Sequence, residues 1–229
     1  MTVPVAVTVT VLALVAGACS DDSTGSAPST ASEHSGHGGD GPFGSSMAPE
    51  TVSVAAVAAL GSGPKVGDTW NEVIGLNVCG RFLEPPVAGG PPVDGIGTDG
   101  TGHFTVAPTT EAGTGHAATI GTLAQQVGIT LSTGSVTLPA STQPAQIDVT
   151  GGVLPVAGAT FVTGQKCGTV PAEVQLWVYT RDAANTGNAV RQVVTNPQDV
   201  PVVEDGMAFV IAFSPASSLP TLPPSALAG

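Results

Sequence analysis

Alternating apolar and polar residues predict several β-strands between Val66 and Pro215. The clearest case lies around Trp70, where Ile74, Leu76 and Val78 share its parity and Asn71, Asn77 and Cys79 share the other, as in a half-buried strand. The same pattern predicts further strands at His103–Pro108, Ser135–Pro139, Ala145–Thr150, Ala172–Thr180 and Gly206–Ser214. The last of these is the most hydrophobic, so we expect it in the middle of a sheet.

One segment has helical rather than strand periodicity. Ile120, Leu123, Ala124 and Val127 recur at the spacing of one helix face, with Thr119 placed to cap the helix start and Gly128 to end it. The Pro- and Gly-rich stretch from 85 to 92 disfavours regular structure as far as His103.

The order of these elements predicts an α+β fold that is mostly β. We expect a mixed sheet with one short helix packed on it, in a β-grasp-like arrangement. A β-sandwich is the alternative, because strand spacing does not decide which strands pair. The 31 glycines, the 20 prolines and the 10% content of charged residues agree with a chain of strands and turns.

The N-terminal residues predict export and lipid anchoring. The 16 residues Val3–Ala18 are almost all apolar, but as a helix they would span about 24 Å, less than the roughly 30 Å of a hydrocarbon core. They fit a signal peptide at residues 1–18. The segment VAGAC resembles the lipobox of bacterial lipoproteins, which implies acylation of Cys19, for example with palmitate, and anchoring at the extracytoplasmic face of the cell membrane. Because no Lys or Arg precedes Lys65, we expect the natural start codon to lie further upstream.

Composition divides the rest of the chain. Residues 19–64 are rich in Ser and Gly and predict a disordered tether, although Val52–Leu60 is apolar enough to dock on the domain. Residues 65–215 predict a single globular domain, and 216–229 a Pro-rich tail. With Cys19 acylated, Cys79 and Cys167 remain as a pair, and in an oxidising compartment such a pair predicts a disulfide.

Three blocks of sequence carry a resemblance that covers the chain from about Gly67 onward. They read GDTWNEVIGLNVCGRFLEPP, GIGTDGTGHFTVAP and EAGTGHAATIGTLAQQVGI. They resemble a family of uncharacterised actinobacterial exported proteins, in which the first two blocks read approximately DHWHAAYGVxVCGxFLPP and GIHTHGDGxIHIHP. The resemblance implies an exported protein without an assigned enzymatic activity.

This chain lacks the histidines of that pattern. Six positions carry other residues: Thr69, Asn71, Gly97, Asp99, Thr105 and Ala107. Histidines at such alternate positions would share one face of a hairpin and suit a metal ion, whereas Thr, Asn, Gly and Ala are poor ligands or none. We therefore expect no metal site here, no cofactor and no catalytic residue; GxSxG, HExxH and phosphate-loop motifs are also missing from the sequence.

Charge narrows the class of partner. The formal net charge of −12 repels nucleic acid. The leading hypothesis is a non-enzymatic envelope module that is anchored to the bilayer and binds another protein, a peptide or a wall component. The alternative is a metal-binding envelope protein that uses His34 and His37 with His103, His116 or Asp99; zinc or copper retained after dialysis would distinguish it.

Overall fold

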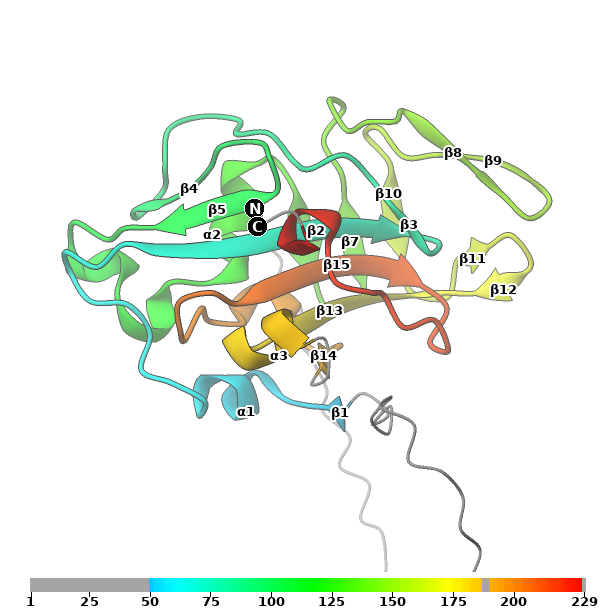
Figure 1. Ribbon diagram of the computed structural model, residues 1–229. Helices are drawn as coiled ribbons and strands as arrows, with labels where there is room; N and C mark the ends of the chain where they lie inside the picture. Colours follow the sequence, from blue (N-terminus) through cyan, green and yellow to red (C-terminus); the bar gives the residue numbers. More distant parts are fainter. Residues whose placement is uncertain (1–49, 187–189, 228–229) are drawn as a thin grey trace, which may run out of the picture. The chain divides into compact units, whose positions relative to one another are not determined.

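The computed structural model describes residues 50–186 and 190–227, which belong to one compact unit, Ser45–Gly229. Its main element is a sheet in the order β1-β14-β13-β15-β2-β5-β4, with β3 paired to the end of β2 (Figure 1). The bounds of these strands are β1 Glu50–Thr51, β2 Trp70–Val78, β3 Arg81–Phe82, β4 Ile96–Thr98, β5 His103–Val106, β13 Glu173–Tyr179, β14 Val190–Val193 and β15 Ala208–Ser214.

The middle of this sheet is a parallel pair, β2 and β15, in which Leu76 lies opposite Ile211. Antiparallel strands flank the pair, β5 beside β2 and β13 beside β15. The helix α2 (Ile120–Gln126) comes between β5 and β13 in the chain. The fold is therefore α+β and mostly β, as predicted, with a mixed sheet and few helices, of which α2 is the longest within the described residues. The strand order, which the sequence left open, comes from the structure, and β15 is central, as expected.

The helix α2 covers one face of the sheet. The Thr119 side chain caps its start by accepting a hydrogen bond from the Thr122 N–H, and Gly128 follows its end with a φ of +76°, a conformation that suits glycine. Ile120 and Leu123 on its apolar side pack into the main core with alternate residues of the neighbouring strands. These strand residues are Ile74 and Leu76 of β2, Phe104 of β5, and Phe209 and Phe213 of β15.

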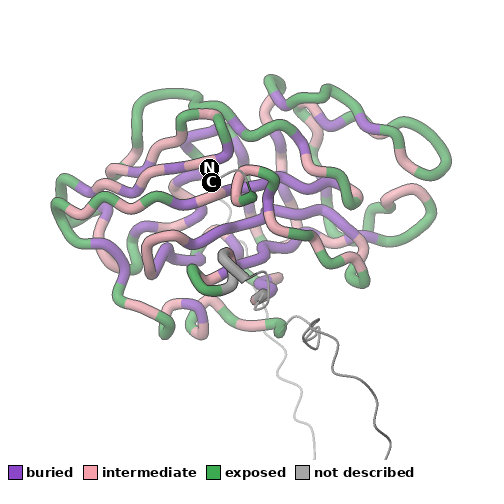
Figure 2. Tube along the Cα trace, in the orientation of Figure 1, coloured by how far each residue is buried: buried purple, intermediate pink, exposed green. Residues whose placement is uncertain are grey.

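The opposite face of the sheet is also buried (Figure 2). Trp177 and Tyr179 of β13 lie there with Val210 of β15, packed against the partly buried Leu222. The pattern-based prediction of a half-buried strand at β2 is thus wrong for its second half, because Gly75 and Asn77 are buried as well. A Cβ added to Gly75 would lie 3.0 Å from Pro223, so the C-terminal segment lies directly on this face.

The folded unit begins earlier and ends later than composition suggested. β1 pairs in parallel with β14, and Val57 of α1 (Val54–Ala58) is fully buried, so the boundary at residue 65 needs correction. The predicted docking of Val52–Leu60 is confirmed. The C-terminal residues also pack, since the Tyr179 hydroxyl donates a hydrogen bond of 2.8 Å to the Pro220 carbonyl. We name residues 215–227 the C-terminal strap.

Short elements complete the unit. A three-stranded sheet has the order β10-β7-β6, and two separate hairpins are β8–β9 and β11–β12. β3 and β4 lie in or beside the Pro- and Gly-rich stretch in which no regular structure was expected. The remaining bounds are β6 Thr130–Ser132, β7 Ser135–Thr137, β8 Gln146–Val149, β9 Gly152–Pro155, β10 Thr160–Val162, β11 Lys166–Cys167, β12 Val170–Pro171, α3 Arg181–Thr186, and the 3-10 helices Glu111–Gly113, Gly115–Ala117, Pro197–Asp199 and Pro224–Leu227.

Several predictions concern residues outside the described ranges. These are the signal peptide at 1–18, acylation of Cys19, and the histidines His34 and His37. Among the helices at 50–186 and 190–227, none has the length and apolar character to cross a membrane.

Candidate binding surface at the hairpin end

One end of the unit consists of short hairpins rather than sheet layers. We call it the hairpin end and define it as β8–β9, β10 and β11–β12, together with the disulfide beside them (Figure 1). Large apolar side chains are exposed here. Val153, Val162 and Val170 are 54%, 43% and 48% exposed, one on each hairpin or strand. Exposed apolar side chains mark an interaction surface where they form a contiguous patch, and these three lie at the same end of the unit.

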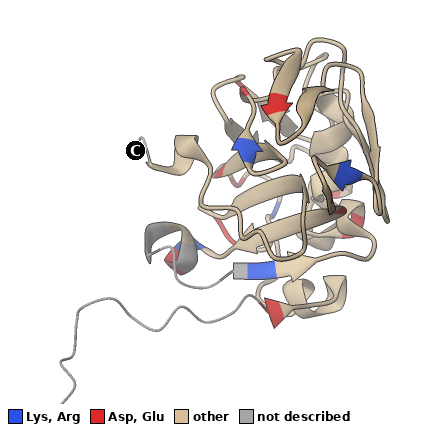
Figure 3. Cartoon of the chain, turned by 90° about the vertical axis from the view of Figure 1, so that its right-hand side faces the viewer, with Lys and Arg blue, Asp and Glu red and all other residues tan. Residues whose placement is uncertain are grey.

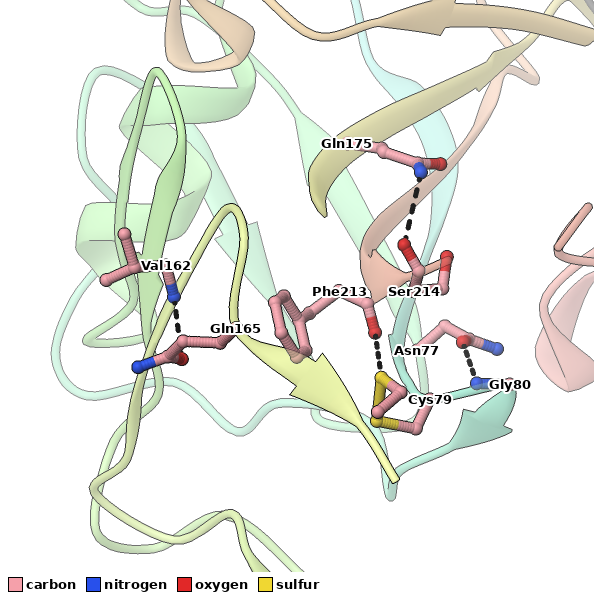
Figure 4. The surroundings of a disulfide bond; sticks show 9 residues. Asn77, Cys79, Gly80, Val162, Gln165, Gln175, Phe213 and Ser214 are labelled. Atoms are coloured by element: carbon pink, nitrogen blue, oxygen red, sulfur yellow. Dashed lines mark hydrogen bonds between the residues drawn. A yellow bond between two sulfur atoms is a disulfide. The ribbon is translucent and has the colours of Figure 1, made fainter. Parts of the chain in front are cut away.

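The disulfide holds this end to the main sheet. Cys79, which follows β2, is bonded to Cys167 of β11, with the two Cα atoms 5.3 Å apart, and this confirms the predicted pairing (Figure 4). The chain turns sharply at Cys79, which has a φ of +54°. The Asn77 side chain supports the turn by accepting a hydrogen bond of 3.0 Å from the Gly80 N–H.

Phe213 of β15 connects the disulfide to the small sheet. Its carbonyl oxygen accepts a hydrogen bond of 2.8 Å from the Cys79 N–H and lies 3.7 Å from the Cys167 sulfur. A disulfide sulfur carries no proton, so the second approach is only a contact. The Phe213 ring stacks on Phe161 of β10 with the ring centres 4.8 Å apart. The hairpin end is therefore packed on the core through two aromatic rings and one covalent bond.

Two grooves flank the β8–β9 hairpin. The first, which we name the β9–β10 groove, has a volume of about 290 Å³ and is lined mostly by apolar residues with Lys166 at its side: Leu154, Pro155, Ala159, Thr160, Phe161, Gln165, Lys166 and Phe213. The second, of about 340 Å³, lies beside the disulfide and is lined by Arg81, Asp148 and the start of the C-terminal strap, among others.

Both strands beside the first groove have a free edge. β10 pairs only with β7, and β9 pairs only with β8, among the described strands. The Leu138 N–H donates to the Ala159 carbonyl, which fixes the alternation of hydrogen bonds along β10 and directs the backbone groups of Thr160 and Val162 away from β7. By the same reasoning, the bond from Val156 to Ala145 directs the backbone of Val153 away from β8. Free strand edges thus border an apolar groove.

Charged side chains of both signs lie at this end. Arg81 follows Cys79 by two residues, Lys166 directly precedes Cys167, and both are exposed. Within the described part of the chain neither makes an ion pair, whereas Arg181 pairs with Asp205 and Arg191 with Glu50. Two of the five Lys and Arg residues of the chain therefore lie at this end, and the exposed Asp148 lies there with them, so blue and red segments both appear on this side in Figure 3.

The histidines of the described ranges do not form a cluster. His103 is half-buried on β5, and the ring of the exposed His116 lies 2.9 Å from the Gly61 carbonyl. Asp99 accepts hydrogen bonds from the hydroxyl and the backbone N–H of Thr101, and these bonds lower its pKa. Nowhere in residues 50–186 and 190–227 do three His, Cys, Asp or Glu side chains come together as a metal ion requires.

The positions that carry histidine in the resembling family lie partly together. Thr105 of β5 is opposite Asn71 of β2 on one side and Gly97 of β4 on the other. Opposite residues in an antiparallel sheet share a face, so the predicted common surface exists. The residues on this surface are poor metal ligands. Gly97 has no side chain, and the Thr105 hydroxyl donates a long hydrogen bond of 3.5 Å to the Asn71 amide oxygen.

One ionisable group that the sequence reasoning missed is buried in the core. Glu72 of β2 is fully buried opposite Phe104, and neither carboxyl oxygen makes a hydrogen bond with a described residue. Its pKa is raised to about 8, chiefly by burial and in smaller part by the nearby Asp205. The backbone N–H groups of Met207 and Gly206 and the Arg181 charge lower the pKa, but they do not compensate for burial. Glu72 lines neither of the two grooves at the hairpin end and is not part of the candidate surface.

Comparisons of the chain with protein-family models, with curated proteins and with solved structures found no match.

Proposed function

We propose that this chain is a lipid-anchored, extracytoplasmic module that acts without catalysis by binding another component of the cell envelope. The observation that carries the proposal is the disulfide-held hairpin end, which combines exposed valines, free strand edges and unpaired cations. A disulfide of this kind persists in an oxidising compartment, which agrees with the apolar run and the cysteine at position 19.

The shape of the surface supports binding more than chemistry. The grooves at the hairpin end are open and border exposed strand edges, and the nearest ionisable groups are Arg81, Asp148 and Lys166. His103 and His116, the two described residues best suited to proton transfer, make isolated local contacts elsewhere. We expect the partner to be an envelope protein, a peptide or a wall component, and the bilayer to be engaged through acylated Cys19.

Two measurements test the proposal. Mass spectrometry of the mature polypeptide should find an acylated Cys19 as the first residue, and Cys19→Ser should release the chain from membranes. Crosslinking in intact cells, with the anchored chain as bait, should then recover a partner beyond those of an unrelated lipoprotein. An unmodified Cys19 would overturn the anchoring, and equal recovery from the unrelated lipoprotein would overturn the binding role.

A further inference from the structure

We infer that the β9–β10 groove receives an extended, carboxylate-bearing peptide segment of a partner protein, which adds as a strand to the free edge of β10. This inference rests on the proposed binding role and names its surface and the chemistry of its partner. It stands on the geometry of the strand edges, the lining of the groove and the charge at its side.

The backbone supplies the first part of the argument. Thr160 directs its N–H and C=O toward the open edge of β10, where no described strand pairs with it. Val162 points the same way, but Gln165 occupies both of its groups: the Val162 N–H donates 3.0 Å to the Gln165 side-chain oxygen, and the Gln165 N–H donates 2.9 Å to the Val162 carbonyl (Figure 4). Gln165 is exposed, so an incoming strand can replace its side chain without disturbing the core.

This arrangement explains how a reactive edge is kept from uncontrolled pairing. Free edges are usually protected by short length, proline or a covering side chain. β10 has three residues, β9 ends at Pro155, and Gln165 covers one N–H, so only a segment that also fits the groove would gain by binding. Addition of a strand uses backbone hydrogen bonds for affinity and side-chain pockets for selectivity.

The lining specifies the side chains of the partner. Leu154, Phe161 and Phe213 give the groove its apolar walls, and alternate residues of a bound strand would face them. Lys166 lies at its side without an ion pair in the described chain, so the local charge favours a carboxylate although the whole protein has a net charge of −12. A segment that alternates apolar residues with Asp or Glu would therefore match both features, whereas a basic segment would be repelled from Lys166.

The test uses the chain from Ser20 onward, which contains the whole compact unit Ser45–Gly229. The probes are two blocked peptides, one alternating Val with Glu and one alternating Val with Lys. In amide correlation spectra, the Glu peptide should shift the signals of Val153, Thr160 and Gln165 before those of the main sheet. Thr160→Pro, which removes an N–H not used in the pairing with β7, should abolish these shifts.

Charge reversal provides a matched control. Lys166→Glu should weaken binding of the Glu peptide about fivefold, while Lys65→Glu, the same change in the loop before the opposite end of β2, should leave it within about twofold. Equal effects of the two reversals, or no shifts at the β10 edge at millimolar peptide, would overturn the inference. So would shifts caused by an N-acetylglucosamine oligomer and not by the peptides. A cellular partner that still binds the Thr160→Pro and Lys166→Glu variants would overturn this groove but leave the proposed function standing.

Discussion

The replacement Glu72→Gln should change how stability depends on pH. Glu72 is the one fully buried carboxyl group among the described residues, and its pKa is raised from 4.5 to about 8 because burial penalises the charged form. Glutamine keeps the size and shape of the protonated acid but cannot ionise. The difference between the two proteins therefore isolates the titration of this one group.

The sign follows from where the proton is held. Below pH 4.5 both the folded and the unfolded chain keep it, so Glu72 then adds no pH dependence. Between pH 4.5 and about 8 the unfolded chain loses the proton that the folded chain retains, and stability falls by about 1.4 kcal/mol per pH unit. Over the whole interval the free energy of unfolding falls by up to roughly 5 kcal/mol. Relaxation of the sheet around the charged carboxylate makes this loss smaller. The loss is complete above about pH 8.

The assay is urea unfolding followed by tryptophan fluorescence at several pH values from 4.5 to 9, since Trp177 is buried next to the central strands. The free energy of unfolding of the unmodified chain should fall steadily relative to that of Glu72→Gln. Glu84→Gln removes one exposed carboxylate and controls for the change in net charge. If the curves of the unmodified chain and Glu72→Gln run parallel across this range, the carboxyl group is not held protonated and the reasoning is refuted.

Three further predictions concern the covalent and terminal restraints. Replacing both Cys79 and Cys167 by Ser should lower the free energy of unfolding by about 4 to 5 kcal/mol, because the bond closes a separation of 88 residues in the unfolded chain; a loss below about 1 kcal/mol in urea unfolding would contradict this. Tyr179 is the only tyrosine, so absorbance titration should find its pKa near 12 in the folded chain because of burial, and near 10 in urea; an ordinary pKa in the folded chain would show that the C-terminal strap does not cover it. A chain that begins at Lys65 should be less stable than one that begins at Ser45 by at least about 2 kcal/mol, through the loss of buried Val57 alone; equal urea midpoints would place residues 50–64 outside the folded unit.

The sequence predicted the parts of the fold that have a strong period. The strands β2, β5, β13 and β15 and the helix α2 all lie within the segments that alternation or helical spacing indicated. Their order also predicted the α+β class with a mixed sheet, but not which strands pair. Each of these segments has several apolar residues that must be buried together, so local pattern and tertiary packing agree.

The short strands β7 and β8 also lie within predicted segments, but the shortest elements could not be predicted in the same way. β3, β11 and β12 have two residues each, too few to show any period. The Gly151–Gly152 pair is a turn signal that could have indicated the β8–β9 hairpin, because both residues have positive φ. The candidate surface was therefore missed, although the sequence correctly supplied the disulfide that holds it.

Glu72 shows a different limit. It lies on the parity of Trp70, Ile74 and Leu76, so the pattern already placed it on the buried face. An apolar pattern is still recognised when one of its positions is polar, so the pattern did not single out Glu72. Its raised pKa follows from its full burial beside β5 and the turn at Asp205–Met207, which only the structure shows.

The disulfide couples the proposed location of the protein to its proposed surface. β11 has only the two-residue pairing with β12, and the Cys79–Cys167 bond ties it to the end of β2. Lys166 precedes Cys167, so the same bond fixes where this charge lies relative to the apolar wall formed by Phe161 and Phe213. In a reducing compartment the central sheet would keep its core, but β11 would lose its covalent attachment and the groove its positioned charge. The β9–β10 groove is therefore complete only while the Cys79–Cys167 bond is intact, as it would be in the oxidising compartment that we propose.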